Sequence, residues 1–257
     1  MFNVLLSCMH QKDFSIIEDS QLNNVPTVIV NQCNCNNIVS EGMYTMISTT
    51  TRGLSVSRNL AIQNSKAEIC LLADDDETFV PCLEEKIMAA YRNIKDADII
   101  IFKMINYPNR FRDKIKKLKK YDCLKVSSYQ ISFRKSAIIE KNIAFDVKLG
   151  AGSGNGASEE NKFLLDCYKK GLKIYYCPIE IALLKPNQST WFNGFDEKFF
   201  FNHGKTTRYI LGLTKAVLYG FYYLLFKHKV YKKDISMWKA NKYLFKGIFA
   251  KGIDSKL

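Results

Sequence analysis

Leu71-Leu72-Ala73-Asp74-Asp75-Asp76-Glu77 is an apolar run that ends in four consecutive acids. Acids packed against one another have raised pKa values and cost stability unless a cation lies among them. In an α/β protein, ligands bind at the carboxyl ends of the strands, and carboxylate oxygens there suit Mg²⁺ or Mn²⁺, with substrate phosphates completing the coordination shell. The stretch therefore predicts a metal–phosphate site. The alternative is an acidic turn that caps a helix beginning near Pro81.

Strand-like and helical patterns alternate on both sides of this stretch. Apolar runs predict short strands at residues 2–7, 27–31, 68–73, 98–103, 127–133 and 173–176. Pro178 is expected to end the last of these strands. Amphipathic patterns predict helices at residues 13–20, 54–65, 83–94 and 159–170, the last one capped by Ser158. This alternation predicts an α/β fold with a mixed, mostly parallel sheet flanked by helices. We expect one catalytic domain over residues 1–204 and a helical appendage over residues 205–257.

Composition is that of a globular protein, since 47% of the 257 residues are apolar and 25% are charged. The chain opens on a strand-like run without a basic leader, so no secretory signal is expected. The eight cysteines then read as free thiols in a reducing cytosol. Cys33-x-Cys35 has the wrong spacing for a zinc knuckle.

The net charge of +13 is concentrated in two segments. Residues 205–257 carry twelve Lys/Arg against two Asp, a net of +10, and residues 110–125 carry eight against two, a net of +6, so the remainder carries 13 − 16 = −3. The run 216–226 is apolar but only about half of the ~20 residues that span a bilayer. Lysines interleave with aromatic residues after it, which predicts a tail lying on an anionic membrane. The alternatives are a helix that covers the core or a homodimer contact. The basic run 110–120 is a solvated helix face or a loop.

Four segments in consistent order, spread over residues 2–205, carry a family resemblance. They are Val28-Ile29-Val30-Asn31-Gln32, Gly53-Leu54-Ser55-Val56-Ser57-Arg58-Asn59, Asp74-Asp75-Asp76-Glu77-Thr78-Phe79-Val80-Pro81, and Ser158-Glu159-Glu160-Asn161 with Gly171-Leu172-Lys173-Ile174-Tyr175. Together they resemble a family 2 glycosyltransferase of the GT-A fold (nucleotide-diphospho-sugar transferase, Rossmann-like), of the bacterial capsule and surface-polysaccharide type.

The resemblance implies roles for the residues around the donor. Asp74 and Asp76 match the D-x-D pair that binds Mg²⁺ or Mn²⁺, with Asp76 as the direct ligand and Asp75 as the ligand in an alternative register. The uracil pocket lies by the end of the second strand, which places Asn31 and Gln32 at the donor. Arg58 is expected to hold the pyrophosphate or the base; its alternative is a surface salt bridge with one of the acids.

The resemblance also implies a general base at the second acidic position of its motif, which is Glu160 here, with Glu159 as the fallback. The alternative for both is favourable placement in the first turn of a helix. The family often has a metal-binding His before a Ser-Thr pair. Lys185 takes that place before Ser189-Thr190 and is expected to contact the diphosphate, whereas His203 is expected to be structural.

The function implied is that of an inverting hexosyltransferase. It would move a hexose from a UDP-sugar to a saccharide acceptor on a lipid carrier, in capsule polysaccharide synthesis at the cytoplasmic face of the membrane. A non-catalytic nucleotide-sugar or membrane scaffold with a degenerate site is the main alternative, supported by Glu at the base position and Lys185 in place of His. Nucleic-acid binding is disfavoured because the basic tail lacks a binding motif and the body is acidic.

Overall fold

The computed structural model describes residues 1–185, 194–250 and 252–253. The chain divides into two compact units. The first comprises Met1–Arg52, Val56–Phe145 and Glu160–Gln188, and the second comprises Gly53–Ser55, Asp146–Glu159 and Ser189–Leu257. The boundary expected after residue 204 falls inside helix α6 (Glu197–Leu211). This helix continues without a break through residue 204 to Leu211.

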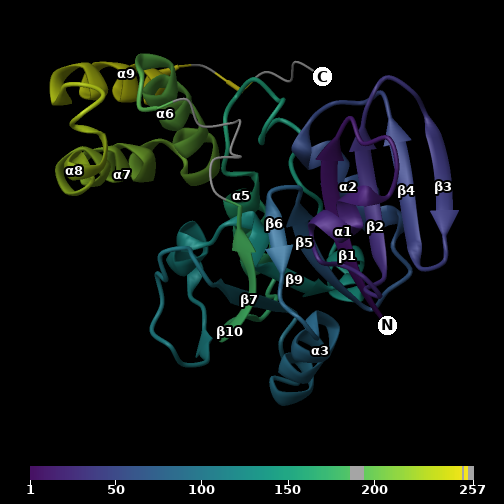
Figure 1. Ribbon diagram of the computed structural model, residues 1–257. Coiled ribbons are helices and arrows are strands. Elements are labelled where there is room, and N and C mark those ends of the chain that lie inside the picture. Colours follow the sequence, from purple (N-terminus) through teal and green to yellow (C-terminus); the bar gives the residue numbers. More distant parts are fainter. Residues whose placement is uncertain (186–193, 251, 254–257) are drawn as a thin grey trace. The chain divides into compact units, whose positions relative to one another are not determined.

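Within the described residues, the first unit is built on a ten-stranded sheet with the order β3-β4-β2-β1-β5-β9-β7-β10-β6, and β8 pairs with β10 (Figure 1). Parallel ladders join β4, β2, β1 and β5, and another joins β7 to β10, while β9 is inserted antiparallel between β5 and β7. The strands are β1 (Phe2–Met9), β2 (Thr27–Gln32), β3 (Asn37–Glu41), β4 (Tyr44–Thr49), β5 (Ile69–Asp74), β6 (Glu77–Phe79), β7 (Ile99–Met104), β8 (Lys116–Lys117), β9 (Ile131–Arg134) and β10 (Ile174–Leu184).

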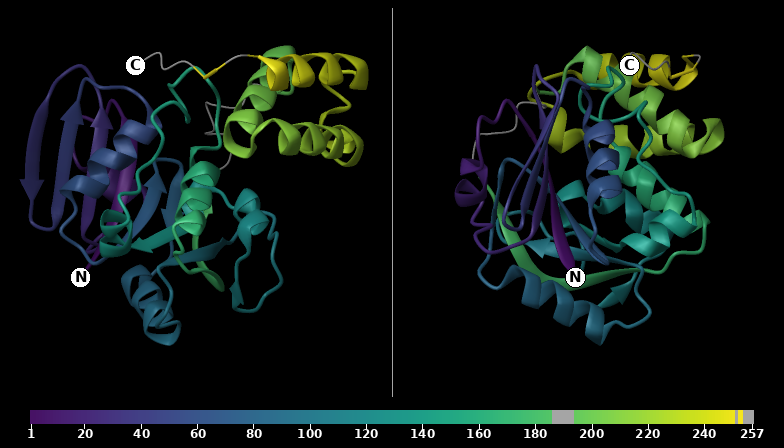
Figure 2. Two further views of the ribbon diagram at one scale, coloured as in Figure 1. Left: turned by 180° about the vertical axis from the view of Figure 1, so that it is seen from behind. Right: turned by 90° about the vertical axis from the view of Figure 1, so that its right-hand side faces the viewer.

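Helices cover both faces of this sheet. The side chains of β1 alternate: Val4 and Leu6 enter the core cluster that contains Ile16 of α1, whereas the Ser7 hydroxyl accepts a hydrogen bond from Ser57 of α2 at 2.9 Å. Figure 2 accordingly shows α1 and α2 on opposite faces of the strands. The helices are α1 (Ser15–Asp19), α2 (Leu54–Asn64), α3 (Leu83–Asn93), α4 (Lys135–Glu140) and α5 (Glu159–Lys169), with 3-10 turns η1 (Lys120–Lys125) and η2 (Ser128–Gln130).

Several features of the sheet differ from the sequence prediction. The strand expected over residues 127–133 begins only at Ile131, because Ser128–Gln130 forms η2, and the short strands β6 and β8 were not predicted. Strand β10 runs through Pro178 to Leu184 instead of ending at the proline. Its pairing with β7 shifts register between Tyr176 and Glu180, so Pro178 lies where the ladder is interrupted and no N–H is needed. The β3–β4 hairpin around Gly42 was not predicted, because every residue of β3 is exposed and the strand has no buried face to read.

The helices of the second unit pack around a core of their own. They are α6, α7 (Leu213–Phe226), α8 (His228–Tyr231) and α9 (Met237–Phe249). Helices α6 and α9 touch through backbone: a Cβ on Gly204 would lie 2.1 Å from the Leu244 carbonyl oxygen, and one on Gly247 would lie 2.0 Å from that of Phe201. Among the described residues, none of the helices reaches the length and apolarity that a membrane crossing requires.

Candidate functional site

The predicted acidic stretch forms the turn between β5 and β6, at the carboxyl edge of the parallel strands. Glu77 is wholly buried, and its Oε1 accepts a hydrogen bond from the Asp74 amide at 2.9 Å. Its Oε2 has no hydrogen-bond partner among the described residues. Burial, reinforced by the charge of Asp74, raises the pKa of Glu77 well above its usual range. Glu77 therefore fixes the turn from inside, and the aspartates are left at the edge of the sheet.

Arg58 of α2 makes a buried ion pair with Asp74. Its Nη2 donates to both carboxylate oxygens of Asp74 at 3.0 Å, and the arginine side chain is only 1% exposed. The guanidinium also lies 5.5 Å from the centre of the Phe145 ring. Ser128 adds a third contact, since its hydroxyl donates to Asp74 Oδ2 at 3.3 Å. The ion pair offered as the alternative role of Arg58 is therefore present, although it is buried and not on the surface.

Asp75 and Asp76 lie beside Lys185, the residue that was predicted to contact a diphosphate. The Lys185 amide donates to the Asp76 carbonyl oxygen at 2.8 Å, and its Nζ donates to the Asp75 carbonyl oxygen at 3.4 Å. Burial and the charge of Asp74 raise the pKa of Asp75. Burial, Asp74 and Asp75 together raise the pKa of Asp76 to about 6. These carboxylates gain stability when positive charge approaches them.

Asp75 and Asp76, whose pKa values are raised by burial and by neighbouring acids, are suitable ligands for a divalent ion. Among the described residues, no three His, Cys, Asp or Glu side chains are gathered as a ready-made cage. Mg²⁺ does not need one, because it is commonly held by one or two carboxylates together with substrate phosphates and water. Asp74 is engaged by Arg58, so Asp76 and Asp75 have the carboxylates better placed to accept an ion. Lys185 would share the phosphates with it.

Asn31 and Gln32 end β2 next to the end of β1, with Asn31 opposite Cys8 and Gln32 opposite Met9. The Asn31 side chain is buried and is used within the protein: it donates to the Gln11 carbonyl oxygen at 2.8 Å and accepts from the Gln11 amide at 2.9 Å. Asn31 therefore fixes the loop that follows β1. The side chain is 1% exposed, so the structure leaves little of it for a ligand to contact.

The two glutamates at the start of α5 differ in exposure. Glu159 is 4% exposed, and a side chain at Gly150 would meet its carboxyl carbon at 3.3 Å. Glu160 is half-buried and lies within electrostatic range of the Tyr107 hydroxyl. The next residue, Asn161, donates to the carbonyl oxygens of Cys123 and Val126, both at 3.0 Å. Glu160 is thus the more accessible candidate for a base.

Residues 123–129 connect the acidic turn to helix α5, a link that sequence reasoning missed. Ser128 bonds Asp74, and the Val126 and Cys123 carbonyls bond Asn161. The signal was weak, because a single serine and a single asparagine carry these contacts. The sequence identified Glu77 as the last of the four acids, but it did not predict that the Glu77 side chain points into the protein core.

The remaining predicted residues lie elsewhere or cannot be placed. His203 belongs to the second unit, where its ring stacks on Phe199 and packs against Tyr223, and burial lowers its pKa to about 4. This agrees with the structural role expected for it. Ser189 and Thr190, which anchored the comparison of Lys185 with a metal-binding His, lie outside the described residues.

Solved structures of S. aureus TarS share this fold. The TarS chain matches with 14% identity and a TM-score of 0.55, covering 80% of this chain and 39% of TarS. TarS 1–349 in complex with UDP-GlcNAc matches with 13% identity and a TM-score of 0.59, covering 96% of this chain and 71% of that one. The UDP complex of the same fragment matches with 13% identity, a TM-score of 0.56, and coverage of 96% and 70%.

This likeness shows the fold alone. It confirms the predicted fold class, a mixed, mostly parallel α/β sheet flanked by helices in a Rossmann-like arrangement. No protein-family model and no curated protein sequence matches the chain.

Proposed function

We propose that this chain is a glycosyltransferase that transfers a hexose from a UDP-sugar to a saccharide acceptor. The observation that carries the proposal is the acidic turn at the carboxyl edge of the sheet, where Asp75 and Asp76 lie beside Lys185. The structures of TarS with UDP-GlcNAc and with UDP support a nucleotide-sugar donor for this fold.

Each residue of the turn then has a role. Asp76, with Asp75, would hold a divalent ion, and Lys185 binds the diphosphate of the donor. Arg58 keeps Asp74 in place through its ion pair. When bound, the ion neutralises charge on the leaving diphosphate. Arg58 acts through Asp74 and is a positioning residue.

Glu160 takes the proton of the attacking acceptor hydroxyl. The acceptor oxygen bonds to the anomeric carbon as the bond from that carbon to the phosphate oxygen breaks, and UDP leaves with the electron pair. A single displacement of this kind inverts the anomeric configuration. Glu159, buried against Gly150, supports the start of the helix.

A screen of nucleotide sugars for released UDP tests the proposal. We expect one donor to be turned over, and we expect Asp76→Asn and Glu160→Gln each to lower kcat at least about 100-fold. Glu85→Gln, an exposed acid on α3, is the matched control and should stay within about twofold. UDP binding without turnover of any donor would instead favour the non-catalytic scaffold.

We further propose that the acceptor is lipid-linked, in surface polysaccharide synthesis at the cytoplasmic face, and that the second unit binds an anionic membrane. Its helices expose large apolar side chains beside lysines, among them Leu218, Phe221, Leu225, Phe226 and Trp238, the last 85% exposed. Apolar groups interleaved with lysines suit the interface of an anionic bilayer.

Vesicle sedimentation tests the membrane contact. Phe226→Ser with Trp238→Ser should weaken binding to vesicles containing 30 mol% phosphatidylglycerol by about tenfold or more. Ile139→Ser, at an exposed apolar residue of α4 in the first unit, should change it little. Loss of self-association in the ultracentrifuge with unchanged vesicle binding would show that the apolar surface is a dimer contact instead.

A further inference from the structure

We propose that Cys33 and Cys35 are a redox-active dithiol. They close to a disulfide by exchange with a low-molecular-weight disulfide, such as oxidised glutathione, and this closure weakens binding of the donor nucleotide. The part that concerns the donor rests on the proposed transferase function, whereas the part that concerns the thiols is independent of it.

The two thiols are already in contact. Cys33 Sγ and Cys35 Sγ lie 3.5 Å apart, and only Asn34 separates the two residues in the chain. A disulfide bond is about 2.05 Å long, so closing it brings the sulfurs together by about 3.5 − 2.05 ≈ 1.5 Å. In the described parts of the chain no third metal ligand gathers with the pair, so thiol–disulfide exchange suits it better than a metal cage.

The two sulfurs differ in the ways that exchange requires. Cys35 is exposed, whereas Cys33 is buried. Hydrogen bonding to the Cys35 backbone lowers the pKa of the Cys33 thiol, which favours its thiolate. The hydrogen bond with Cys33 raises the pKa of Cys35. The exposed sulfur is therefore the one that meets a small disulfide, and the buried sulfur is prepared to attack afterwards.

The exchange has two steps. Cys35 loses its proton and its sulfur attacks one sulfur of the small disulfide RSSR, so that RS⁻ leaves and takes up a proton. The Cys33 thiolate then attacks Cys35 Sγ, the mixed disulfide breaks, and the second RS⁻ leaves and is protonated. Overall, two protein thiols are oxidised and one small disulfide is reduced to two thiols. A disulfide that closes so short a loop is strained and easily reduced again, which suits reversible regulation in a reducing compartment.

The dithiol lies at the same edge of the sheet as the acidic turn. Strand β1 pairs in parallel with β2 on one side and with β5 on the other, so the loop after β2 and the turn after β5 leave the sheet at one edge. Neighbouring strands are about 4.8 Å apart, which puts the two strand ends about 10 Å apart. Cys8, near the end of β1, connects them, because its thiol is within electrostatic range of both Asp75 and Cys33. Burial raises the pKa of Cys8, so this thiol stays protonated and does not compete in the exchange.

A nucleotide bound at the acidic turn extends toward the dithiol. Ligands of such sheets lie outside the carboxyl ends of the strands. On one side of β5 the neighbour is β9, which is antiparallel and presents its amino end at this edge, whereas on the other side β1 and β2 present their carboxyl ends. With the diphosphate at Asp75 and Asp76, the nucleoside is therefore expected over β1 and β2.

The loop that carries the dithiol is also bonded to the segment after β4. Asn34 Oδ1 accepts a hydrogen bond from Arg52 Nη2 at 2.8 Å, and Asn36 Oδ1 accepts one from the Thr50 amide at 2.9 Å. Drawing the two sulfurs together displaces both asparagines and the end of β2. The surface that meets the nucleoside then loses its preorganised shape, and donor affinity falls.

Mass spectrometry of the protein treated with millimolar oxidised glutathione tests the thiol chemistry without any turnover. Cys82, an exposed thiol at the start of α3, is the internal control. We expect Cys82 to keep a glutathione adduct, while Cys35 loses its adduct and the peptide with Cys33 and Cys35 lacks two hydrogens. In Cys33→Ser, Cys35 should keep its adduct as Cys82 does. Cys35→Ser changes an exposed side chain and should leave the adduct at Cys82 alone; equal melting temperatures would show that both variants fold.

Isothermal titration calorimetry with UDP and Mg²⁺ tests the coupling to the donor. We expect the oxidised wild type to bind UDP at least about fivefold more weakly than the reduced protein, and dithiothreitol to restore the affinity. Saturating UDP should oppose formation of the disulfide by the same factor, because coupling between two sites is reciprocal. Cys33→Ser combined with Cys35→Ser should bind UDP equally well before and after oxidation, whereas Cys82→Ser should respond as the wild type does.

A stable glutathione adduct on Cys35 of the wild type, like that on Cys82, would overturn the proposal, because the neighbouring thiol would then not resolve it. A complete Cys33–Cys35 disulfide with unchanged UDP affinity would overturn the coupling to the donor. If the reduced protein binds no UDP and no donor is turned over, the transferase proposal fails, while the mass measurement still decides whether the dithiol closes.

Discussion

Replacing Arg58 by methionine tests the electrostatic account of the acidic turn. The substitution keeps an apolar stem of similar length and removes the guanidinium that bonds both oxygens of Asp74. Breaking a buried ion pair by removing one partner costs roughly 3–5 kcal/mol, because the other charge is left uncompensated. Asp74 is 23% exposed and keeps the Ser128 hydroxyl, so the lower end applies. We expect Arg58→Met to lose about 3 kcal/mol of unfolding free energy at pH 7.5.

Urea denaturation followed by far-UV circular dichroism measures this loss. Lys173→Met is the control, because Lys173 and Asp96 form an ion pair at 3.5 Å in which both side chains are about half exposed. Exposed pairs of that kind contribute about 0–1 kcal/mol. A loss below about 1 kcal/mol for Arg58→Met, similar to that of Lys173→Met, would refute the reasoning. It would mean that solvent already screens the acids of the turn.

Three further predictions follow from the same contacts. The pKa of Asp76 is about 6 in the folded protein and near 4 in the unfolded chain, so the folded state loses stability as pH rises through 6. Without metal, Asp76→Asn should therefore be more stable than the wild type by on the order of 1 kcal/mol at pH 8. In thermal melts this gain should vanish near pH 4. Gly247→Ala should destabilise the helical unit by about 3 kcal/mol in urea titrations, because the new Cβ would meet backbone atoms. Gly220→Ala should be nearly neutral, because its Cβ would meet only the ends of side chains, at 3.0 Å from Ile248, 3.4 Å from Phe245 and 3.7 Å from Leu244. Asn31→Ala should cost about 2 kcal/mol by the same method because it leaves both backbone groups of Gln11 without their partner; a cost no larger than that of Ser40→Ala, which removes an exposed bond to Thr45, would contradict this.

The parts of the fold that the sequence predicted correctly are those with a strong local pattern. Strands β1, β2, β5 and β7 are continuous apolar runs, since they are buried on both faces, and α3 and α5 have clear apolar stripes. Strand β3 has no buried residue, so its sequence shows no alternation of apolar and polar residues from which a strand could be predicted. Strand β10 continues past Pro178 only because its partner changes register there, which is a property of the pair and not of either segment.

In the candidate site, too, residue types could be predicted from the sequence, whereas features that depend on tertiary packing could not. The acids, Arg58 and Lys185 were identifiable from residue type and order, and the structure brings them together. The direction of each side chain was not identifiable. Arg58 points to Asp74 instead of to open space, and the Asn31 amide is used on the Gln11 backbone, because tertiary packing chooses among rotamers that the sequence leaves equally open.

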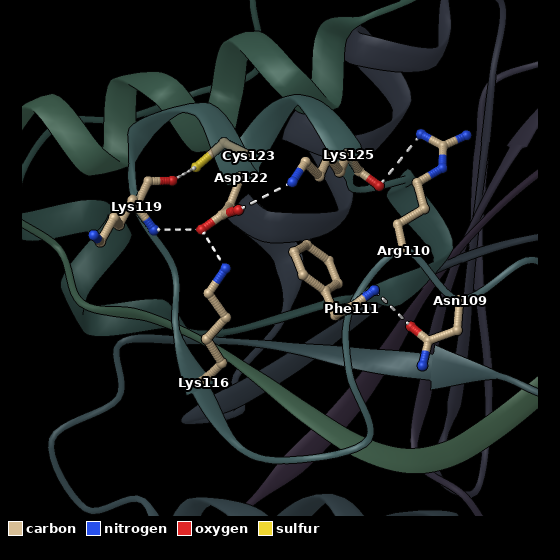
Figure 3. Close-up of polar contacts among 8 residues, drawn as sticks. All are labelled: Asn109, Arg110, Phe111, Lys116, Lys119, Asp122, Cys123 and Lys125. Atoms are coloured by element: carbon tan, nitrogen blue, oxygen red, sulfur yellow. Dashed lines mark hydrogen bonds and ion pairs between the residues drawn. The ribbon is translucent and has the colours of Figure 1, made fainter.

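Figure 3 shows polar contacts inside residues 107–126, and the way in which this segment is attached decides where it tolerates change. Asn161 bonds the carbonyl groups of Cys123 and Val126, and β8 holds the middle of the segment against the start of β10. The exposed side chains of Arg112 and Lys114 lie before this pairing. A fluorophore attached at either position therefore reports on the site from a distance, because it disturbs neither the β8–β10 ladder nor the bonds to α5.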